Sequence, residues 1–275
     1  MKTIRYKSQG NDVEVLEELL KELGFNVDQA NTYFDLATHE AVKDFQKHYH
    51  LVVDGIVGPK TWSKLFAVRD SSLNDYHEKL LKELDLVVFG EKHDLELPVV
   101  KAVNEVESRG EGFLRDGRPK ILFEGHIFWR QLKKAGLDPK DYLNDYTKNV
   151  LYERWVKKHY DGNEKEYFRL EKAAGVSDLA EVHNAAFMSA SWGSFQIMGF
   201  HYKSLGYTSV DHFVSSMYQK EAKHLDAFGR FLEVNNLIKP LKEKDWHRFA
   251  RGYNGPGYLK NKYHEKLESA YQRYA

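Results

Sequence analysis

Two carboxylates lie two residues apart in a segment that predicts a helix, and its geometry separates them. The helix begins at Pro98, where a proline fits the first turn, and it ends before Gly110. Its apolar residues recur at helical spacing and form one stripe: Val99, Ala102, Val103 and Val106. At 100° per residue, Glu107 falls beside this stripe and Glu105 falls on the opposite side of the helix.

The two positions predict different roles. Glu105 follows Lys101 by one turn, so we expect a solvated helix-face charge that can pair with this lysine. Glu107 is expected to face the domain interior, where burial disfavours the anion and raises the pKa of a carboxyl group. A carboxyl group that stays protonated near neutral pH can donate a proton to a leaving oxygen. The alternative is an ordinary buried glutamate held by hydrogen bonds, and the geometry favours the acid.

Two later segments combine glycines with polar side chains that can bind a ligand. Residues 191–199 read Ser-Trp-Gly-Ser-Phe-Gln-Ile-Met-Gly, in which the glycines permit close backbone approach and Gln196 offers an amide. Residues 253–257, Tyr-Asn-Gly-Pro-Gly, predict a tight turn that presents the Tyr253 hydroxyl toward a cleft. Standing alone, the first segment would be a loop with a packed tryptophan and the second merely a turn. Their order after Glu107 matters only through a family resemblance, which is described below.

The elements that position these groups divide into two parts. Residues from about 8 to 67 predict three helices, the first at Val13–Leu23, the second starting at Thr38 as its N-cap, and the third starting at Pro59. We expect Trp62, Leu65 and Phe66 of the third helix to face inward. The sequence thus predicts a small three-helix domain over residues 1–67.

The remainder of the chain predicts a larger domain that is also mainly helical. Residues 68–76 are polar and turn-rich and predict a linker. Residues 77–275 read mostly as helices with short polar loops, and Lys120–Phe123 is the one apolar run of strand character. The expected fold class is therefore mainly α, with a small three-helix bundle followed by a larger helical domain.

The N-terminal part carries a specific family resemblance. Phe45-Gln46, followed by Leu-Val-Val-Asp-Gly-Ile-Val-Gly-Pro-Lys-Thr-Trp over residues 51–62, resembles the signature of the peptidoglycan-binding domain 1 family. Modules of this family are three-helix bundles found beside wall-degrading enzymes. The resemblance therefore implies a wall-binding module, and it implies that five residues serve it: Phe45, Gln46, Asp54, Gly55 and Trp62.

The larger part also resembles a known group of enzymes. Glu107-Ser108, residues 191–199 and Ala250–Gly255 occur in the order found in the lysozyme-like superfamily, particularly goose-type lysozymes and lytic transglycosylases. More closely, residues 106–108 followed by 117–128 look like the N-acetylmuramidase domain of phage endolysins. The resemblance implies hydrolysis of the β-1,4 bond between N-acetylmuramic acid and N-acetylglucosamine in peptidoglycan. Glu107 would be the general acid, and the substrate would meet five further residues: His126, Ser191, Gln196, Tyr253 and Asn254.

The second carboxylate of such a reaction is left open by the sequence. Glycosidases commonly pair the acid with a base or nucleophile. Glu124 is the first candidate because it ends the apolar run at 121–123 and precedes His126. Other acidic residues of the same domain are Glu111, Asp116 and Glu181, and for each candidate an ion pair or loop charge is as good an interpretation. A lytic transglycosylase needs no such base, since the substrate's own hydroxyl attacks and gives 1,6-anhydro products.

Composition excludes several other classes. Lysine plus arginine and aspartate plus glutamate both number 41, so no basic bias favours nucleic-acid binding. There is no cysteine, and the 13 histidines include no His-Glu-x-x-His pattern, so we expect neither a metal nor a cofactor. Two alternatives remain: a non-catalytic wall-binding phage structural protein, and nucleic-acid binding through basic clusters such as Lys157-Lys158 or Lys242–Lys244. Such short charge runs are usually solvated helix faces.

The chain has no targeting or membrane signal that we recognise. Its first ten residues lack an apolar core, and no apolar run approaches the roughly 20 residues that span a bilayer. We expect a soluble monomer made in the host cytoplasm, without stable membrane insertion, that reaches the periplasmic peptidoglycan with the help of a holin. The stretch from Lys260 to Arg273 predicts a basic amphipathic helix, which either disturbs an outer membrane or, as we favour, packs on the domain.

Overall fold

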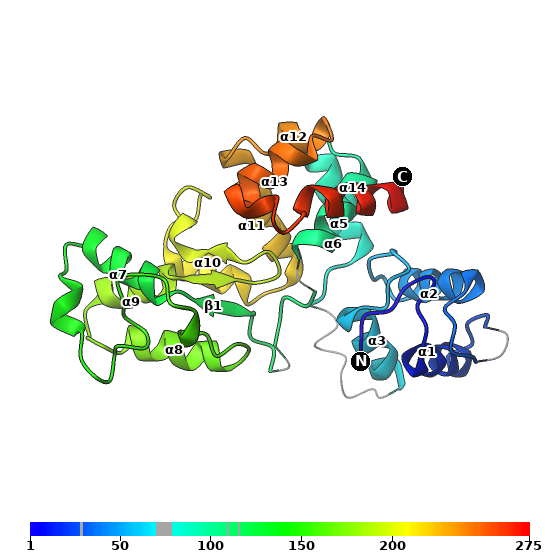
Figure 1. Ribbon diagram of the computed structural model, residues 1–275, viewed down its shortest axis with the longest axis horizontal. Coiled ribbons are helices and arrows are strands. Elements are labelled where there is room, and N and C mark those ends of the chain that lie inside the picture. The colour runs from blue at the N-terminus through cyan, green and yellow to red at the C-terminus, as the bar shows by residue number, and fades with distance from the viewer. Residues whose placement is uncertain (28–29, 70–78, 109, 115) are drawn as a thin grey trace. The chain divides into compact units, whose positions relative to one another are not determined.

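A computed structural model describes residues 1–27, 30–69, 79–108, 110–114 and 116–275 (Figure 1). The chain divides into two compact units, one made of Met1–Glu111 with Leu237–Ala275 and the other of Gly112–Asn236. The expected mainly helical fold is confirmed. Residues 70–76 of the linker predicted at 68–76 lie outside the described residues.

The N-terminal three-helix bundle begins the first unit. It consists of α1 (Asn11–Glu22), α2 (Leu36–His48) and α3 (Pro59–Arg69). The side chain of Asp35 caps α2 by accepting a hydrogen bond from the backbone N–H of Thr38 at 2.8 Å, so Asp35 is the N-cap and the prediction of Thr38 was wrong. An aspartate three residues earlier offers the same capping chemistry and lets the helix start one turn sooner.

Apolar residues from all three helices meet in one core. The fully buried members include Val13, Leu16, Phe34, Phe45 and Leu65. Trp62 is also buried, but Phe66 is 37% exposed, so the prediction that it faces inward was wrong. Phe66 instead stacks on the ring of Trp62, with ring centroids 6.0 Å apart.

The rest of the first unit is built from helices that come from distant parts of the sequence. They are α5 (Glu83–His93), α6 (Leu97–Glu107), α12 (Ile238–Lys242), α13 (Trp246–Asn254), the 3-10 helix η5 (Pro256–Tyr258) and α14 (Tyr263–Tyr274). The red helix α14 of Figure 1 packs against α6 and buries Leu267 and Ala270 completely. The C-terminal basic helix is thus a packed closing helix, as the favoured interpretation predicts. None of the helices described is long and apolar enough to cross a membrane.

The second unit combines a small sheet with helices. Strands β1 (Ile121–Phe123), β2 (Ala190–Trp192) and β3 (Ile197–Met198) form an antiparallel sheet in the order β1-β2-β3. The strand at β1 was predicted, whereas no strand was predicted at β2 or β3. The α-helices are α7 (Gly125–Lys134), α8 (Lys165–Ala174), α9 (Ala180–Met188), α10 (Val210–Met217) and α11 (Glu221–Val234). The 3-10 helices are η2 (Pro139–Tyr142), η3 (Lys157–His159) and η4 (Gly199–His201).

A buried ion pair ties α8 to strand β1. The guanidinium of Arg169 lies 2.6 Å from the Glu166 carboxylate, and the two side chains are 3% and 0% exposed. The backbone N–H of Phe123 donates to Glu166 at 3.1 Å, and the Phe123 carbonyl accepts from Arg169 at 2.8 Å. The other oxygen of Glu166 accepts from the backbone N–H groups of Asp161 and Gly162 at 2.8 and 2.9 Å. Strand, helix and the loop before the helix are therefore joined by one pair of charges.

Candidate functional site

Glu107 is the last residue of α6 and is 7% exposed, which confirms the burial predicted from helical phase. Its Oε2 accepts a hydrogen bond at 3.1 Å from the side-chain amide of Asn254, the last residue of α13. Gly255 follows in the left-handed region, at φ 74°, and ends α13 there. The tight turn predicted at 253–257 is wrong at its start, because Tyr253 and Asn254 still belong to α13, and it is the end of this helix that delivers Asn254 to the acid.

The prediction for Glu105 was wrong. Its side chain is only 17% exposed and accepts hydrogen bonds from Arg5 at 3.0 Å, Arg273 at 2.6 Å and Tyr274 at 2.7 Å. Burial alone would raise the pKa of Glu105, but the hydrogen bonds from Arg273 and Tyr274 outweigh it and leave the pKa below its ordinary value. Glu105 is a structural anion, because α14 and the N-terminal segment cover the helix face that the sequence predicts to be solvated.

The expected pairing of Glu105 with Lys101 is replaced by another contact. Lys101 lies 2.6 Å from Glu83 and donates to the carbonyl of Val53 at 2.7 Å. Glu83 in turn accepts a hydrogen bond from the backbone N–H of Val53 at 2.8 Å. One lysine and one glutamate thus satisfy both backbone groups of a single loop residue.

Asn254 donates a hydrogen bond to Glu107. We therefore expect the removal of the Asn254 amide to lower kcat without weakening substrate binding. A hydrogen bond to a charged group contributes about 1.5–3 kcal/mol, which corresponds to a roughly 10- to 100-fold lower kcat for Asn254→Ala. Steady-state kinetics on purified sacculi would check this, with the exposed Asn235→Ala as the matched control. An Asn254→Ala enzyme that keeps the wild-type kcat would contradict the assignment.

Tyr253 differs from its neighbour. Its ring stacks on Phe249 with the centroids 5.8 Å apart and the planes 9° apart, and the side chain is half-buried. The structure therefore places the ring against its own helix. Its contact with substrate stays a prediction.

In the second unit, Ser191 and Gln196 are bound to each other. The Ser191 hydroxyl donates to Gln196 Oε1 at 2.9 Å, and Gln196 Nε2 donates to the Gly193 carbonyl at 2.8 Å. Gln196 has a φ of 50°, in the left-handed region that favours glycine, so these bonds stabilise a strained turn. The amide predicted to meet a sugar is engaged within the β2–β3 turn, and its role toward substrate stays a prediction.

A buried histidine holds the same turn by a hydrogen bond to its backbone. His224 is 1% exposed and its Nδ1 accepts from the backbone N–H of Ser194 at 3.1 Å. Its Nε2 lies 2.7 Å from the carbonyl of Met217, which makes Nε2 the protonated nitrogen. A Cβ added at Gly193 would lie 2.6 Å from the His224 ring, so only glycine fits there.

Glu124, the first candidate for a second carboxylate, lies directly before α7 as its N-cap residue. Burial raises the pKa of Glu124, and a hydrogen bond from the Tyr160 hydroxyl offsets this only in part. His126 Nδ1 lies 3.3 Å from Glu124, and burial followed by the charge of Arg130 lowers the pKa of this histidine. The sequence did not predict Tyr160, which is 36 residues away from its partner.

Two other acidic candidates have ordinary surroundings. Asp116 pairs with Arg118 at 2.7 Å and is 43% exposed, and Glu181 is exposed in the first turn of α9. Among the described residues no group of three or more histidines, aspartates or glutamates is arranged to hold a metal ion.

The residues singled out in the N-terminal domain build its internal structure. Gln46, 1% exposed, donates to Asp54 at 2.7 Å and accepts from the backbone N–H of Gly55 at 2.8 Å. Gly55 has a φ of 67°, and a Cβ there would lie 2.0 Å from the His39 ring. Phe45 and Trp62 belong to the core. Direct contact of these residues with the wall stays a prediction.

Asp54→Asn should alter how the stability of the N-terminal domain depends on pH. Burial raises the pKa of Asp54 from 3.8 to about 6, although hydrogen bonds from Ile56 and Gln46 counteract it. The folded state therefore holds the proton more tightly, so this stabilisation is complete below about pH 4 and is lost as the pH rises through 6. A shift of about two pKa units corresponds to about 3 kcal/mol.

The measurement is urea unfolding of both proteins at pH 4 and at pH 7. The free energy of unfolding of the wild type, relative to Asp54→Asn, should fall by up to about 3 kcal/mol between these values. An unchanged difference would show that Asp54 does not titrate in this range.

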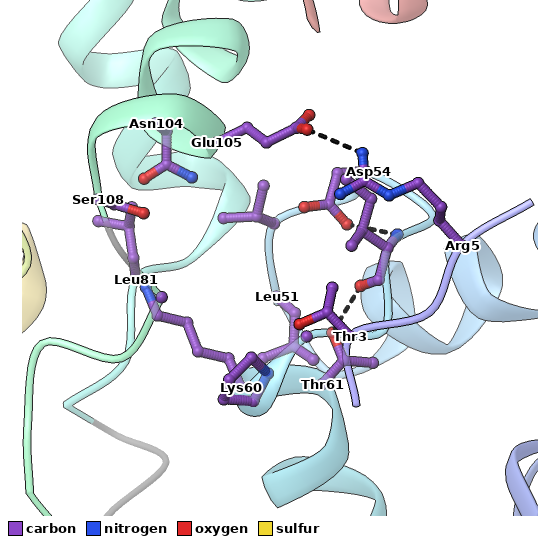
Figure 2. A pocket seen from close by; sticks show the side chains of 15 residues that line it. Thr3, Arg5, Leu51, Asp54, Lys60, Thr61, Leu81, Asn104, Glu105 and Ser108 are labelled. Carbon is purple, nitrogen blue, oxygen red and sulfur yellow. Dashed lines mark hydrogen bonds and ion pairs between the residues drawn. The ribbon is translucent and has the colours of Figure 1, made fainter. Parts of the chain in front are cut away.

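The first unit contains a cavity of about 400 Å³, and Figure 2 shows the side chains that line it. The side chains that reach it come from the N-terminal segment, the loops around α3 and the end of α6, and include Arg5, Asp54, Lys60, Asn104, Glu105 and Ser108. The Arg5–Glu105 ion pair lies along one side. Glu107 is not among the lining residues, so this cavity is separate from the candidate acid.

Comparisons with known proteins agree with this organisation. Residues 96–275 match the N-acetylmuramidase family, and residues 9–65 match a putative peptidoglycan binding domain. The crystal structure of Burkholderia AP3 phage endolysin is similar over 100% of this chain and 98% of that chain, with 41% identity and a TM-score of 0.86.

A curated relative matches a short part of the chain. The N-acetylmuramoyl-L-alanine amidase CwlM of Mycobacterium tuberculosis (strain ATCC 25618 / H37Rv) is 40% identical over 57 residues, which is 21% of this chain and 14% of that protein. The predicted pairing of an N-terminal peptidoglycan-binding domain with a muramidase domain is confirmed. The chain therefore belongs to the N-acetylmuramidase family, as a muramidase-type glycoside hydrolase that carries a peptidoglycan-binding domain.

Proposed function

We propose that this protein is a phage endolysin that hydrolyses the β-1,4 bond between N-acetylmuramic acid and N-acetylglucosamine, with Glu107 as the general acid. The observation that carries the proposal is the burial of Glu107 at the end of α6, where Asn254 holds one carboxylate oxygen. The match of residues 96–275 to the N-acetylmuramidase family and the similarity to an endolysin over the whole chain support it.

In this proposal Glu107 protonates the glycosidic oxygen as the bond to the anomeric carbon breaks. Positive charge then develops on the sugar ring, and the deprotonated Glu107 is left hydrogen-bonded to Asn254. Water adds its oxygen to the anomeric carbon and gives its proton to a base, for which Glu124 is our candidate. His126, Ser191, Gln196 and Tyr253 remain proposed substrate contacts. For Asn254, which the resemblance assigns to the substrate, we propose instead a role on Glu107. The residues around Gln46 and Asp54 remain the proposed wall-binding surface.

Mass spectrometry of digested sacculi tests the reaction. Reducing N-acetylmuramic acid ends are expected. Products with 1,6-anhydro ends would show that the sugar's own hydroxyl attacks and that the enzyme is a lytic transglycosylase. Cleaved stem peptides with intact glycan strands would overturn both.

We further propose that the protein acts as a monomer on glycan strands alone, without nucleic acid or stable membrane insertion. It would be made in the host cytoplasm and would need a holin to reach the periplasmic wall. Cells that express it should then lyse only after their inner membrane is permeabilised. Spontaneous lysis without permeabilisation would contradict the need for a holin, and light scattering would reveal any dimer.

A further inference from the structure

Trp155 stands apart from the other tryptophans of the chain. All five lie in the part that the structure describes, and four of them are between 1% and 7% exposed: Trp62, Trp129, Trp192 and Trp246. Trp155 is 59% exposed. An exposed indole offers a broad apolar face, with an N–H at its edge, on which a ligand ring can pack.

A second aromatic ring lies beside it and is held from two sides. The rings of Trp155 and Tyr160 have centroids 6.1 Å apart and planes tilted by 36°. The Tyr160 hydroxyl donates a hydrogen bond to Glu124, and the guanidinium of Arg169 lies over the Tyr160 ring at 5.3 Å. Tyr160 is therefore fixed in place next to the exposed indole.

The buried pair of Glu166 and Arg169 explains how this segment is held. Burying two charges is expensive, and it is offset only where further hydrogen bonds satisfy both groups. Here those bonds go to the backbone of Asp161 and Gly162 and to strand β1. Residues directly after Tyr160 are thus tied to the sheet, and the aromatic pair is arranged before any ligand arrives, which lowers the entropy lost on binding.

We propose that Trp155 and Tyr160, together with Glu124, form a subsite for one N-acetylhexosamine ring of the glycan strand. This inference rests on the proposed function. The indole face would pack on the C–H groups of the sugar, and the Glu124 carboxylate would accept a hydrogen bond from a hydroxyl or an acetamido N–H. The subsite would therefore include the candidate second carboxylate.

The charges around the indole favour this occupant. Arg154, Lys157 and Lys158 are exposed near Trp155 in the sequence and complement the carboxylates on the peptides of a glycan strand. A single-stranded nucleic acid could also stack on Trp155 beside these cations. The Glu124 carboxylate that accepts from Tyr160 would repel its phosphates, so the glycan is favoured.

The exposure of Trp155 provides a direct test, because its fluorescence is the most accessible to quencher. In full-length Glu107→Gln protein, which should not cleave its ligand, we expect N-acetylglucosamine tetramer to shift the emission to the blue and to protect it from acrylamide. Trp155→Ala should abolish this response and weaken binding by calorimetry at least tenfold. Trp155→Phe should recover part of the affinity, since it restores an aromatic face.

Steady-state kinetics distinguish a role of Trp155 in substrate binding from a merely structural one. In the otherwise wild-type chain, Trp155→Ala should raise KM on sacculi about tenfold while kcat and the melting temperature stay unchanged. Phe168→Ala is the matched control, because Phe168 is 67% exposed on α8, and it should change neither KM nor affinity.

Three results would overturn the subsite: a fluorescence response that persists in Trp155→Ala, an unchanged KM, or quenching by an oligonucleotide but not by the saccharide. If any of these three results is found and the wild-type protein still releases reducing muramic acid ends, the subsite is wrong and the proposed function stands. Conversely, cleavage of peptides instead of glycan would defeat the proposed function, and the saccharide titration would still decide the subsite by itself.

Discussion

Glu107→Gln is expected to lower the release of reducing muramic acid ends about 100- to 10,000-fold while leaving the fold intact. Glutamine has the same shape and can still accept the hydrogen bond from Asn254 through its carbonyl. It has no acidic proton to give to the leaving oxygen, and general acid catalysis contributes about 10²- to 10⁴-fold. The release of ends from purified sacculi, with circular dichroism as the folding check, measures the effect.

The same helix offers a matched control two residues earlier. Glu105→Gln removes a carboxylate that is also poorly exposed, but this one binds Arg5 and Arg273. We expect the variant to melt at a lower temperature and to keep the wild-type kcat when assayed well below that temperature. Glu107 is not the general acid if Glu107→Gln retains more than a tenth of the wild-type activity. The same conclusion follows if both variants lose activity equally.

Arg169→Met should destabilise the unit formed by residues 112–236 by about 3–5 kcal/mol. The change leaves the Glu166 carboxylate at 0% exposure without its cation, and an unpaired buried charge is far more costly than the loss of an exposed ion pair. It also removes the donor to the Phe123 carbonyl. Urea unfolding followed by hydrogen exchange at Asp161 and Gly162 would localise the loss to this unit.

Two further variants sharpen that result. Arg230→Met breaks an ion pair with Asp226 in which the arginine is 38% exposed, so it should cost about 1 kcal/mol or less. Adding Glu166→Gln to Arg169→Met should recover part of the stability, because glutamine carries no charge and its one side-chain oxygen can still accept from the backbone N–H groups of Asp161 and Gly162. If Arg169→Met were no more destabilising than Arg230→Met, the buried pair would not have the stabilising role assigned to it.

Local patterns were enough for the helices and for the burial of the acid. The helix that ends at Glu107 has eleven residues. Its apolar residues recur with a period of about 3.6, and this period predicts which side of the helix faces the core. The third helix of the N-terminal domain begins at Pro59 for an equally local reason, since proline fits the first turn. The two family resemblances rest on short motifs in a fixed order, and both are confirmed.

The same local reasoning failed where a partner comes from far along the chain. Glu105 is 100 residues from Arg5 and 168 from Arg273, so nothing in its own helix reveals that this face is covered. The β2–β3 hairpin was missed because strands of three and two residues are too short to show an alternating pattern.

Glu107 shows the difference between what neighbouring residues in the sequence reveal and what only the packing of distant elements reveals. The sequence by itself determined that this carboxyl group is buried at a helix end and that it belongs to a peptidoglycan-cleaving domain, because helical period and motif order are properties of neighbouring residues. Only the tertiary structure decided that Asn254, 147 residues later, holds its Oε2, and that Tyr160 binds Glu124. Such pairs depend on how separate elements pack, and packing brings together residues whose spacing in the sequence carries no signal.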